Sequence, residues 1–322
     1  MLTTQRIPSY IELLRTIGIP GLIEGTKGPG SEQLMKLAQL NKIALLYSSV
    51  LSDDFYQKDL LPKYQLLMDT LKDVSRIFSN SGIQYSIFKT IKPFPTTPSD
   101  VDVLLRADDF GRAEGLLLSA GYKRTASDDF SSTLEREMIV DLQLQPSVSN
   151  LPYLSSAFFM QNTILKSFEG FDIHTLDLEA EAIVTASHSF YKEQMFTLND
   201  YYTITLLVEQ LDISKLIKLA SDNNVTDVLN IITGICSQLT ESVFQTRLKV
   251  NTIGEKLGLP PPQLLHDSDL PMKFPFGLVF RLLIDRASKD KDMRRTIVPA
   301  LLRLASPRQL AKLVSHMRRK TY

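Results

Sequence analysis

The spacing of apolar positions changes twice along the chain. Over residues 1 to about 80, apolar residues recur every three or four positions, which is the spacing of amphipathic helices. The clearest run stops at Asn80-Ser81-Gly82, where a glycine is typical of a helix end. Its apolar positions are Leu60, Leu61, Tyr64, Leu67, Met68, Leu71, Val74 and Phe78. The sequence therefore predicts an N-terminal helical region.

The next seventy residues follow a different pattern. Residues 83–88, 99–105 and 138–144 alternate between apolar and polar positions, as half-buried strands do. Between the second and third of these strands, residues 108–120 have helical spacing, and Gly121 follows as a stop signal. This part of the chain is therefore expected to mix strands with a helix.

Helical spacing returns after about residue 150. It predicts helices over 178–194, 200–211, 213–220 and 225–239, with Asp200 and Asp212 as N-caps, and a last helix opening at Ser306-Pro307. The expected fold is of the α+β class, with a small mixed sheet in a core flanked by helices. The expected units are an N-terminal helical region over 1–80, the core over 81–150, and a helical C-terminal domain with a basic tail over 151–322.

Two carboxylates alternate with apolar residues in the strand over 99–105. Because successive side chains of a strand point to opposite faces, Asp100 and Asp102 project together from the face opposite Val101 and Val103. Alternation over 138–144 places Asp141 where it could join them. Adjacent carboxylates repel unless a cation lies between them, and Mg²⁺ takes such hard oxygen ligands together with substrate phosphates. The competing interpretation is a solvated edge strand of alternating polarity.

These residues resemble a known pattern. In the nucleotidyltransferases of the DNA polymerase β superfamily, a strand and a short glycine motif precede an Asp-apolar-Asp strand, and a further Asp lies on a later strand. Here Ile87-Phe88-Lys89-Thr90 is similar to the first motif of a prokaryotic group with a minimal catalytic core and helical flanks. Asp100, Asp102 and Asp141 match the three acids. Downstream, the helical segment with His188 and the segment Leu198-Asn199-Asp200-Tyr201 are also similar, so the resemblance covers residues 81 to about 220.

The resemblance implies a polymerase β-like core and an activity of the EC 2.7.7 type. A nucleoside monophosphate would move from an NTP to an acceptor hydroxyl, with pyrophosphate as the leaving group. Asp100, Asp102 and Asp141 would be the catalytic residues and would hold two Mg²⁺ or Mn²⁺ ions, which stabilise the attacking and leaving oxygens. Asp141 would also help to deprotonate the acceptor. A toxin-like enzyme that modifies host RNA would use the same site.

One position departs from the family motif. Thr90 stands where the family has glycine, and a residue with a Cβ restricts both positive φ and close approach to phosphates. Lysine side chains can supply charge instead. The candidate nucleotide-binding residues are Lys89, Thr90, Lys92, Ser99, His188 and Lys192. The alternative to an active enzyme is a catalytically silent nucleotide-binding or partner-binding module with the same fold.

The net charge of zero hides a basic C-terminus. Residues 281–320 contain twelve Lys and Arg against three acids, which predicts either a solvated helical face or a surface for a polyanion such as RNA, tRNA included. The candidate nucleic-acid-binding residues are Arg294, Arg295, Arg308, Lys312, Arg318, Arg319 and Lys320.

The remaining composition bounds the setting. Cys236 is the single cysteine, so no intrachain disulfide forms and a reducing compartment is expected. No stretch approaches the 18 apolar residues of a membrane span, so the cytoplasm is the expected location. None of the four histidines forms a close metal-ligand pair with another. The sequence leaves the acceptor, the NTP, the oligomeric state and the role of the first 80 residues open.

Overall fold

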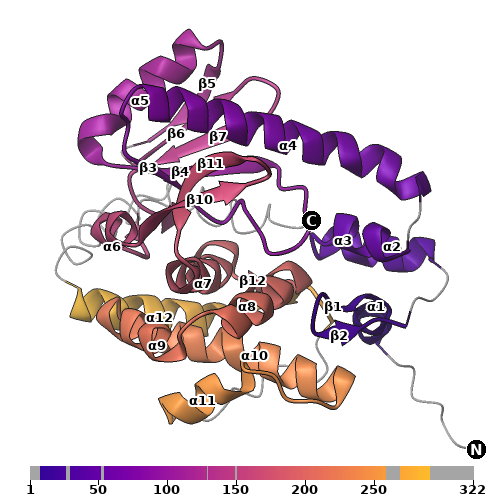
Figure 1. Cartoon of the computed structure of the whole chain (residues 1–322). Coiled ribbons are helices and arrows are strands. Elements are labelled where there is room, and N and C mark those ends of the chain that lie inside the picture. The colour runs from indigo at the N-terminus through magenta and orange to yellow at the C-terminus, as the bar shows by residue number, and fades with distance from the viewer. Residues whose placement is uncertain are drawn as a thin grey trace, which may run out of the picture.

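A computed structural model of the chain describes residues 8–26, 30–51, 54–128, 130–148, 151–258 and 269–290. Its centre is a seven-stranded mixed sheet with strand order β10-β11-β3-β4-β7-β6-β5 (Figure 1). The strands are β3 (Tyr85–Ile87), β4 (Asp100–Leu105), β5 (Lys123–Ser127), β6 (Ser131–Glu135), β7 (Ile139–Gln143), β10 (Thr163–Phe168) and β11 (Phe171–Leu176). The expected α+β fold class is confirmed.

The strand β4 lies in the middle of the sheet. It pairs antiparallel with β3 and parallel with β7, in a register that puts Asp102 opposite Asp141. The interpretation of β4 as a solvated edge strand is therefore wrong, because both of its edges are hydrogen-bonded and Asp102 is buried. Its alternating polarity has a different cause: one face of the sheet is apolar and the other holds carboxylates.

The helices α4 (Asp54–Asn80) and α5 (Ala107–Ser119) cover the apolar face of the sheet (Figure 1). Leu71 and Val74 of α4 belong to one buried cluster with Val101 and Val103 of β4. The predicted stop signals are confirmed, since α4 ends at Asn80 and α5 at Ser119, with Gly82 and Gly121 at positive φ just beyond. Burial of this face determines which way β4 turns its carboxylates.

The other helices form a second layer on the carboxylate side of the sheet (Figure 1). They are α7 (Leu178–Ser187), the π-helix η1 (His188–Glu193), α8 (Leu198–Gln210), α9 (Ile213–Asp222), α10 (Thr226–Phe244), α11 (Asn251–Leu257) and α12 (Phe276–Lys289). The strand β11 leads directly into α7, whose N-cap Asp177 accepts a hydrogen bond from the Ala180 amide. This connection sets the helical layer against the sheet.

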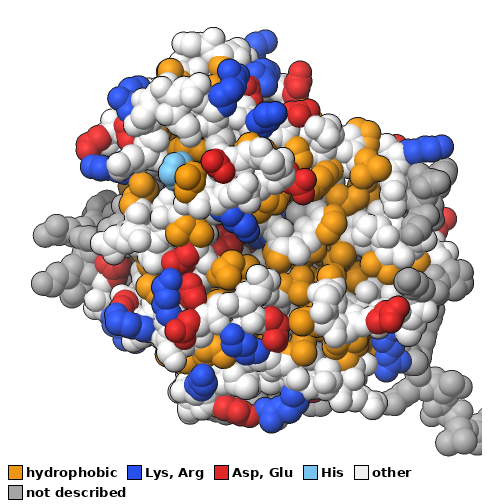
Figure 2. Space-filling view, in the orientation of Figure 1, with side chains coloured by type: hydrophobic (Ala, Val, Ile, Leu, Met, Phe, Trp, Pro, Cys, Tyr) orange, Lys and Arg blue, Asp and Glu red, His pale blue; other side chains and the backbone are white. Residues whose placement is uncertain are grey.

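The N-terminal helices pack into the same core as the second layer. They are α1 (Ser9–Ile17), α2 (Glu32–Leu40) and α3 (Ala44–Leu51). Short hairpins and a small helix complete the described elements: β1 (Gly18–Ile19), β2 (Ile23–Glu24), β8 (Ser147–Val148), β9 (Leu151–Pro152), α6 (Ser156–Gln161), β12 (Met195–Phe196) and β13 (Met272–Lys273). Figure 2 shows hydrophobic side chains gathered in the region below α4. A cavity of about 230 Å³ lies there, with Leu67, Met68 and Phe168 in its wall.

Two local features differ from the sequence-based expectations. The hairpins β5–β6 and β10–β11 were not expected, and the second extends the sheet to residue 176, beyond the predicted core over 81–150. Asp200 is not an N-cap, because Thr197 caps α8 and Asp200 completes the capping box three residues later. Asp212 does cap α9. The helix at Ser306-Pro307 lies outside the described residues.

Candidate active site

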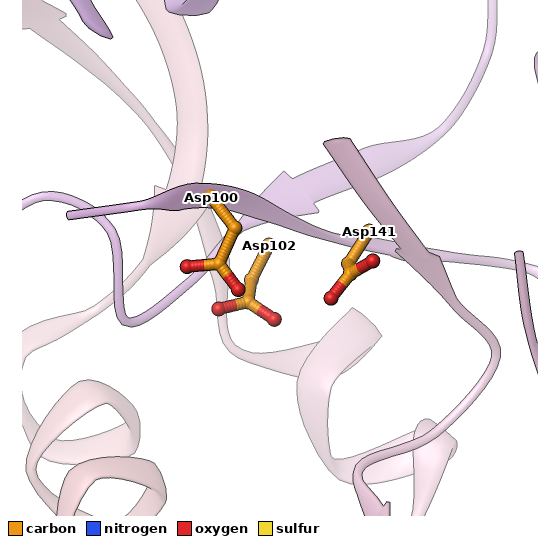
Figure 3. Close-up of side chains that lie close together, drawn as sticks. All are labelled: Asp100, Asp102 and Asp141. Carbon is orange, nitrogen blue, oxygen red and sulfur yellow. The ribbon is translucent and has the colours of Figure 1, made fainter. Parts of the chain in front are cut away.

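The three aspartates converge at one edge of the β4–β7 pair. Asp100 and Asp102 lie two residues apart on β4, and Asp141 lies on β7 opposite Asp102. Their side chains point to the same side of the sheet (Figure 3). One oxygen of each carboxylate lies within 4.8 Å of one oxygen of the others. The convergence predicted from alternation is therefore present.

Asp102 is the most buried of the three carboxylates. Its Oδ2 lies 3.0 Å from the ammonium of Lys89, and its Oδ1 accepts a hydrogen bond of 2.6 Å from the side-chain amide of Gln143. Burial acts to raise the pKa of Asp102, but the positive charges of Lys89 and Lys192 outweigh it and hold the pKa below its usual value. Asp102 is therefore ionised at neutral pH.

Asp100 and Asp141 have the opposite electrostatic balance. Burial, followed by repulsion from Asp102, raises the pKa of Asp100 to about 6. Burial also raises the pKa of Asp141, whose Oδ1 is buried and has no hydrogen-bond partner. An unpaired buried carboxylate oxygen is costly. A further positive charge at this point would stabilise the ionised forms of Asp100 and Asp141.

This donor set fits a divalent cation. Three carboxylates offer hard oxygen ligands within a few ångströms of one another, which is the chemistry that Mg²⁺ and Mn²⁺ prefer. The unpartnered Oδ1 of Asp141 supplies an oxygen that a bound ion would satisfy. The residues that could hold the ion are thus the three predicted from the sequence.

The turn after β3 brings Lys89 into the site. Lys89 has a φ of 59°, so it adopts the left-handed conformation that glycine adopts most easily. Its amide donates to both carboxylate oxygens of Glu181 on α7, at 3.0 and 3.2 Å. The comparison with the glycine motif placed the departure at Thr90, whereas the residue with positive φ is its neighbour Lys89. The turn therefore forms without glycine.

Thr90 is buried and takes part in the backbone structure. Its hydroxyl accepts a hydrogen bond of 3.0 Å from the Asp102 amide and donates to the Phe88 carbonyl at 3.2 Å. The Thr90 amide donates to the same carbonyl at 2.7 Å. These contacts extend the pairing of β3 with β4 past the end of the ladder. Thr90 thus positions the Asp102 backbone, and its hydroxyl is already hydrogen-bonded.

The π-helix η1 faces the cluster from the helical layer. His188 lies with its Nδ1 3.3 Å from the Lys89 ammonium and 3.0 Å from the Tyr153 hydroxyl, while its Nε2 is 3.3 Å from Glu193. Burial, with the charge of Lys89, lowers the pKa of His188 to about 3, so the ring is neutral at pH 7. Since both neighbours of Nδ1 can donate, we assign the proton to Nε2. His188 therefore orients Lys89.

The other predicted binding residues have varied surroundings. The positive charge of Lys192 acts on all three carboxylates. Ser99 donates to Asp100 at 3.3 Å. Lys92 is buried, with its ammonium 3.8 Å from Glu181 rather than at an aspartate. The basic positions from Arg294 to Lys320 lie outside the described residues, so their predicted role stays a prediction.

Sequence reasoning missed three residues that shape the site. Gln143 shares a face with Asp141 by alternation, so the same pattern could have found it. Tyr153 and Glu181 come from other elements and contact the site only through tertiary packing. No local signal marks them.

Part of the chain is similar to a known protein family. Residues 97–241 match the family described as uncharacterised nucleotidyltransferase. This segment contains β4, β7 and all three carboxylates, and its similarity to a nucleotidyltransferase family agrees with the motif. No curated protein sequence matches the chain. Among the described residues, no helix is both long and apolar enough to cross a membrane.

Two solved structures of an antibiotic-resistance factor show weak similarity to this chain. One is a crystal structure of ANT(2")-Ia in complex with adenylyl-2"-tobramycin, with 10% sequence identity, a TM-score of 0.40, and coverage of 49% of this chain and 97% of that chain. The other is a solution structure of ANT(2'')-Ia, with 13% identity, a TM-score of 0.36, and coverage of 52% and 91%.

Replacing Thr90 tests whether its hydroxyl is structural. Thr90→Val leaves the buried Asp102 amide without an acceptor, so we expect a loss of about 1–3 kcal/mol in the free energy of unfolding. Thr90→Ser retains the hydroxyl and is expected to cost less than about 1 kcal/mol, the value of one methyl group. Urea denaturation of both variants measures the difference. Equal losses would show that the hydroxyl contributes nothing.

The raised pKa of Asp100 predicts that ionisation of this carboxylate lowers the free energy of unfolding. The native state holds this proton more tightly than the unfolded state, so stability falls as the pH rises from 3.8 to about 6. The pKa difference corresponds to at most about 3 kcal/mol. Asp100→Asn should therefore stabilise the metal-free protein by up to this amount at pH 7.5, and by little at pH 4.

The measurement is denaturant unfolding in EDTA at both pH values. Asp59→Asn, at an exposed carboxylate of α4, is the matched control. If Asp100→Asn is no more stable than this control at pH 7.5, the ionised Asp100 carboxylate does not destabilise the folded protein.

Proposed function

We propose that the chain is a divalent-metal-dependent nucleotidyltransferase that moves a nucleoside monophosphate from an NTP to an acceptor hydroxyl. The observation that carries this proposal is the meeting of Asp100, Asp102 and Asp141 on paired strands, within a segment that matches a nucleotidyltransferase family. The family match supports transfer of a nucleotide in general. The three residues supply the place where it would occur.

Each residue of the cluster has a distinct role in this proposal. Bound metal would supply Lewis-acid stabilisation of the charge on the reacting α-phosphate and on the leaving pyrophosphate. Asp100, Asp102 and Asp141 would hold it through their converging oxygens. Asp141, whose pKa is raised by burial, is suited to accept the proton of the acceptor hydroxyl. Lys89 and Lys192 would bring positive charge to the phosphates.

The silent module is an alternative because Thr90 stands in place of the motif glycine. Lys89 adopts the positive φ that a glycine would provide, so the turn is formed. The Oδ1 atom of Asp141 is also buried without a hydrogen-bond partner, which lowers stability and is more readily explained if the site has a function. These features favour the enzyme over the silent nucleotide-binding or partner-binding module. The following experiment distinguishes the two.

Removal of a carboxylate should abolish transfer. Asp102→Asn and Asp141→Asn each remove a candidate metal ligand, and we expect incorporation of label from α-³²P-labelled NTPs to fall by at least about a hundredfold. The acceptors offered are RNA, protein and small hydroxyl compounds, each with Mn²⁺ or with EDTA. Asp59→Asn, far along α4 on its exposed side, should retain activity. Triphosphate binding without transfer by the parent protein would identify the silent module instead.

The basic C-terminus generates a separate prediction about the acceptor. If RNA is the acceptor, removing a side chain that neutralises one phosphate should flatten the salt dependence of tRNA binding by roughly one unit of slope. We therefore expect a chain ending before Ser306 to bind tRNA with a smaller slope across a salt series than the intact chain does. Equal, negligible binding by both chains would remove RNA as the acceptor and leave a smaller hydroxyl compound.

A further inference from the structure

We propose that Lys89 is the resident cation of the carboxylate cluster and that it couples metal binding to triphosphate binding. In this proposal its ammonium neutralises Asp102 in the ligand-free protein and leaves for a triphosphate when a divalent ion binds the carboxylates. The inference rests on the proposed function and adds a regulatory step to it. Its basis is the set of contacts around a single side chain.

The Lys89 ammonium contacts the carboxylate cluster directly, through Asp102. It is 3.0 Å from the Asp102 carboxylate, and both side chains are only 9% exposed. It also lies 3.3 Å from His188 Nδ1 and 4.6 Å from the centre of the Phe88 ring. These contacts with a carboxylate, a neutral imidazole and a ring face all favour a cation. These contacts therefore offset part of the cost of burying the positive charge.

The backbone holds Lys89 in place at some cost. A non-glycine residue in the left-handed conformation is unfavourable by roughly 1 kcal/mol. The Glu181 carboxylate compensates by accepting the Lys89 amide with both oxygens. Because the backbone is fixed at this position, only the flexible side chain of Lys89 can move away from Asp102.

Both oxygens of Asp102 already have a partner while Lys89 is in contact with it. Its Oδ2 pairs with Lys89, and its Oδ1 accepts from Gln143 at 2.6 Å. An ammonium within a few ångströms of a divalent ion would be repelled strongly in this buried setting. Metal binding through Asp102 therefore favours withdrawal of Lys89. A buried ammonium that loses its carboxylate needs another anion, and a triphosphate supplies several oxygens.

This exchange makes the two ligands depend on each other. For the nucleotide-free protein, Lys89 competes with metal for Asp102 and weakens metal binding. For the metal-loaded protein, the displaced Lys89 binds phosphate and strengthens triphosphate binding. By linkage, each ligand then favours the other. Removing the ammonium should thus change the two affinities in opposite directions, whereas a purely structural role for Lys89 would weaken both.

The test compares Lys89→Met and Lys89→Gly with the parent protein. The glycine variant removes the ammonium while permitting the positive φ, which covers the case that methionine disturbs the turn. Lys63→Met, at an exposed position of α4, is the control of equal charge change. Circular dichroism melts establish that each variant is folded.

Two affinities are measured for each protein. Mn²⁺ binding to the nucleotide-free form is followed by electron paramagnetic resonance of the free ion, and we expect both Lys89 variants to bind about tenfold more tightly than the parent. Binding of α,β-methylene ATP, saturated with Mn²⁺, is followed by calorimetry, and we expect about tenfold weaker binding. Lys63→Met should match the parent in both.

The outcomes separate this inference from the proposed function. Unchanged or weaker Mn²⁺ binding by both Lys89 variants overturns the proposed role of Lys89. The proposed metal site is still supported in that case if the parent protein binds Mn²⁺ and Asp141→Asn does not. If the parent and the Lys89 variants all fail to bind both Mn²⁺ and the analogue, the proposed function is wrong as well.

Discussion

Mutual repulsion among three carboxylates, one buried and two partly buried, is the constraint on which the rest of the site depends. Parallel pairing of β4 with β7 puts Asp102 opposite Asp141, and alternation along β4 adds Asp100 on the same face. Burial limits the screening of these charges by solvent, so the surrounding elements must supply positive charge or hydrogen-bond donors. The turn after β3 supplies Lys89, η1 supplies Lys192, and β7 itself supplies Gln143.

The sheet and the helical layer contribute to the site together. The carboxylates belong to the sheet, whereas Glu181, His188 and Lys192 come from α7 and η1. A π-helix, in which the backbone hydrogen bond spans an extra residue, is common at functional sites because it redirects side chains locally. Here η1 begins at His188, which is the residue in contact with Lys89. The helical layer therefore orients the cation that the sheet requires.

The sequence predicted the sheet face better than the turn. Period-two alternation depends only on local geometry, so it identified β4, β7 and the three aspartates from the residues alone. The hairpin β10–β11 was missed because its strand β10 is mostly exposed on both sides and lacks a clear alternating pattern. Lys89 was recognised as a source of charge, but its conformation was not, since positive φ at a lysine is fixed by tertiary contacts. Tyr153 and Glu181 were missed because they also reach the site only through tertiary contacts.

The exchange of glycine for larger residues changes how this turn could recognise phosphate. A glycine turn offers backbone amides to a phosphate at close approach. Here the Lys89 amide already donates to Glu181 and the Thr90 amide to Phe88, so both amides are satisfied within the protein. In the proposed function, recognition of a triphosphate by this turn would come from the ammonium of Lys89. An ammonium can move between two anions, whereas a backbone amide cannot, and this mobility is what would allow one side chain to serve first the empty carboxylates and then the nucleotide.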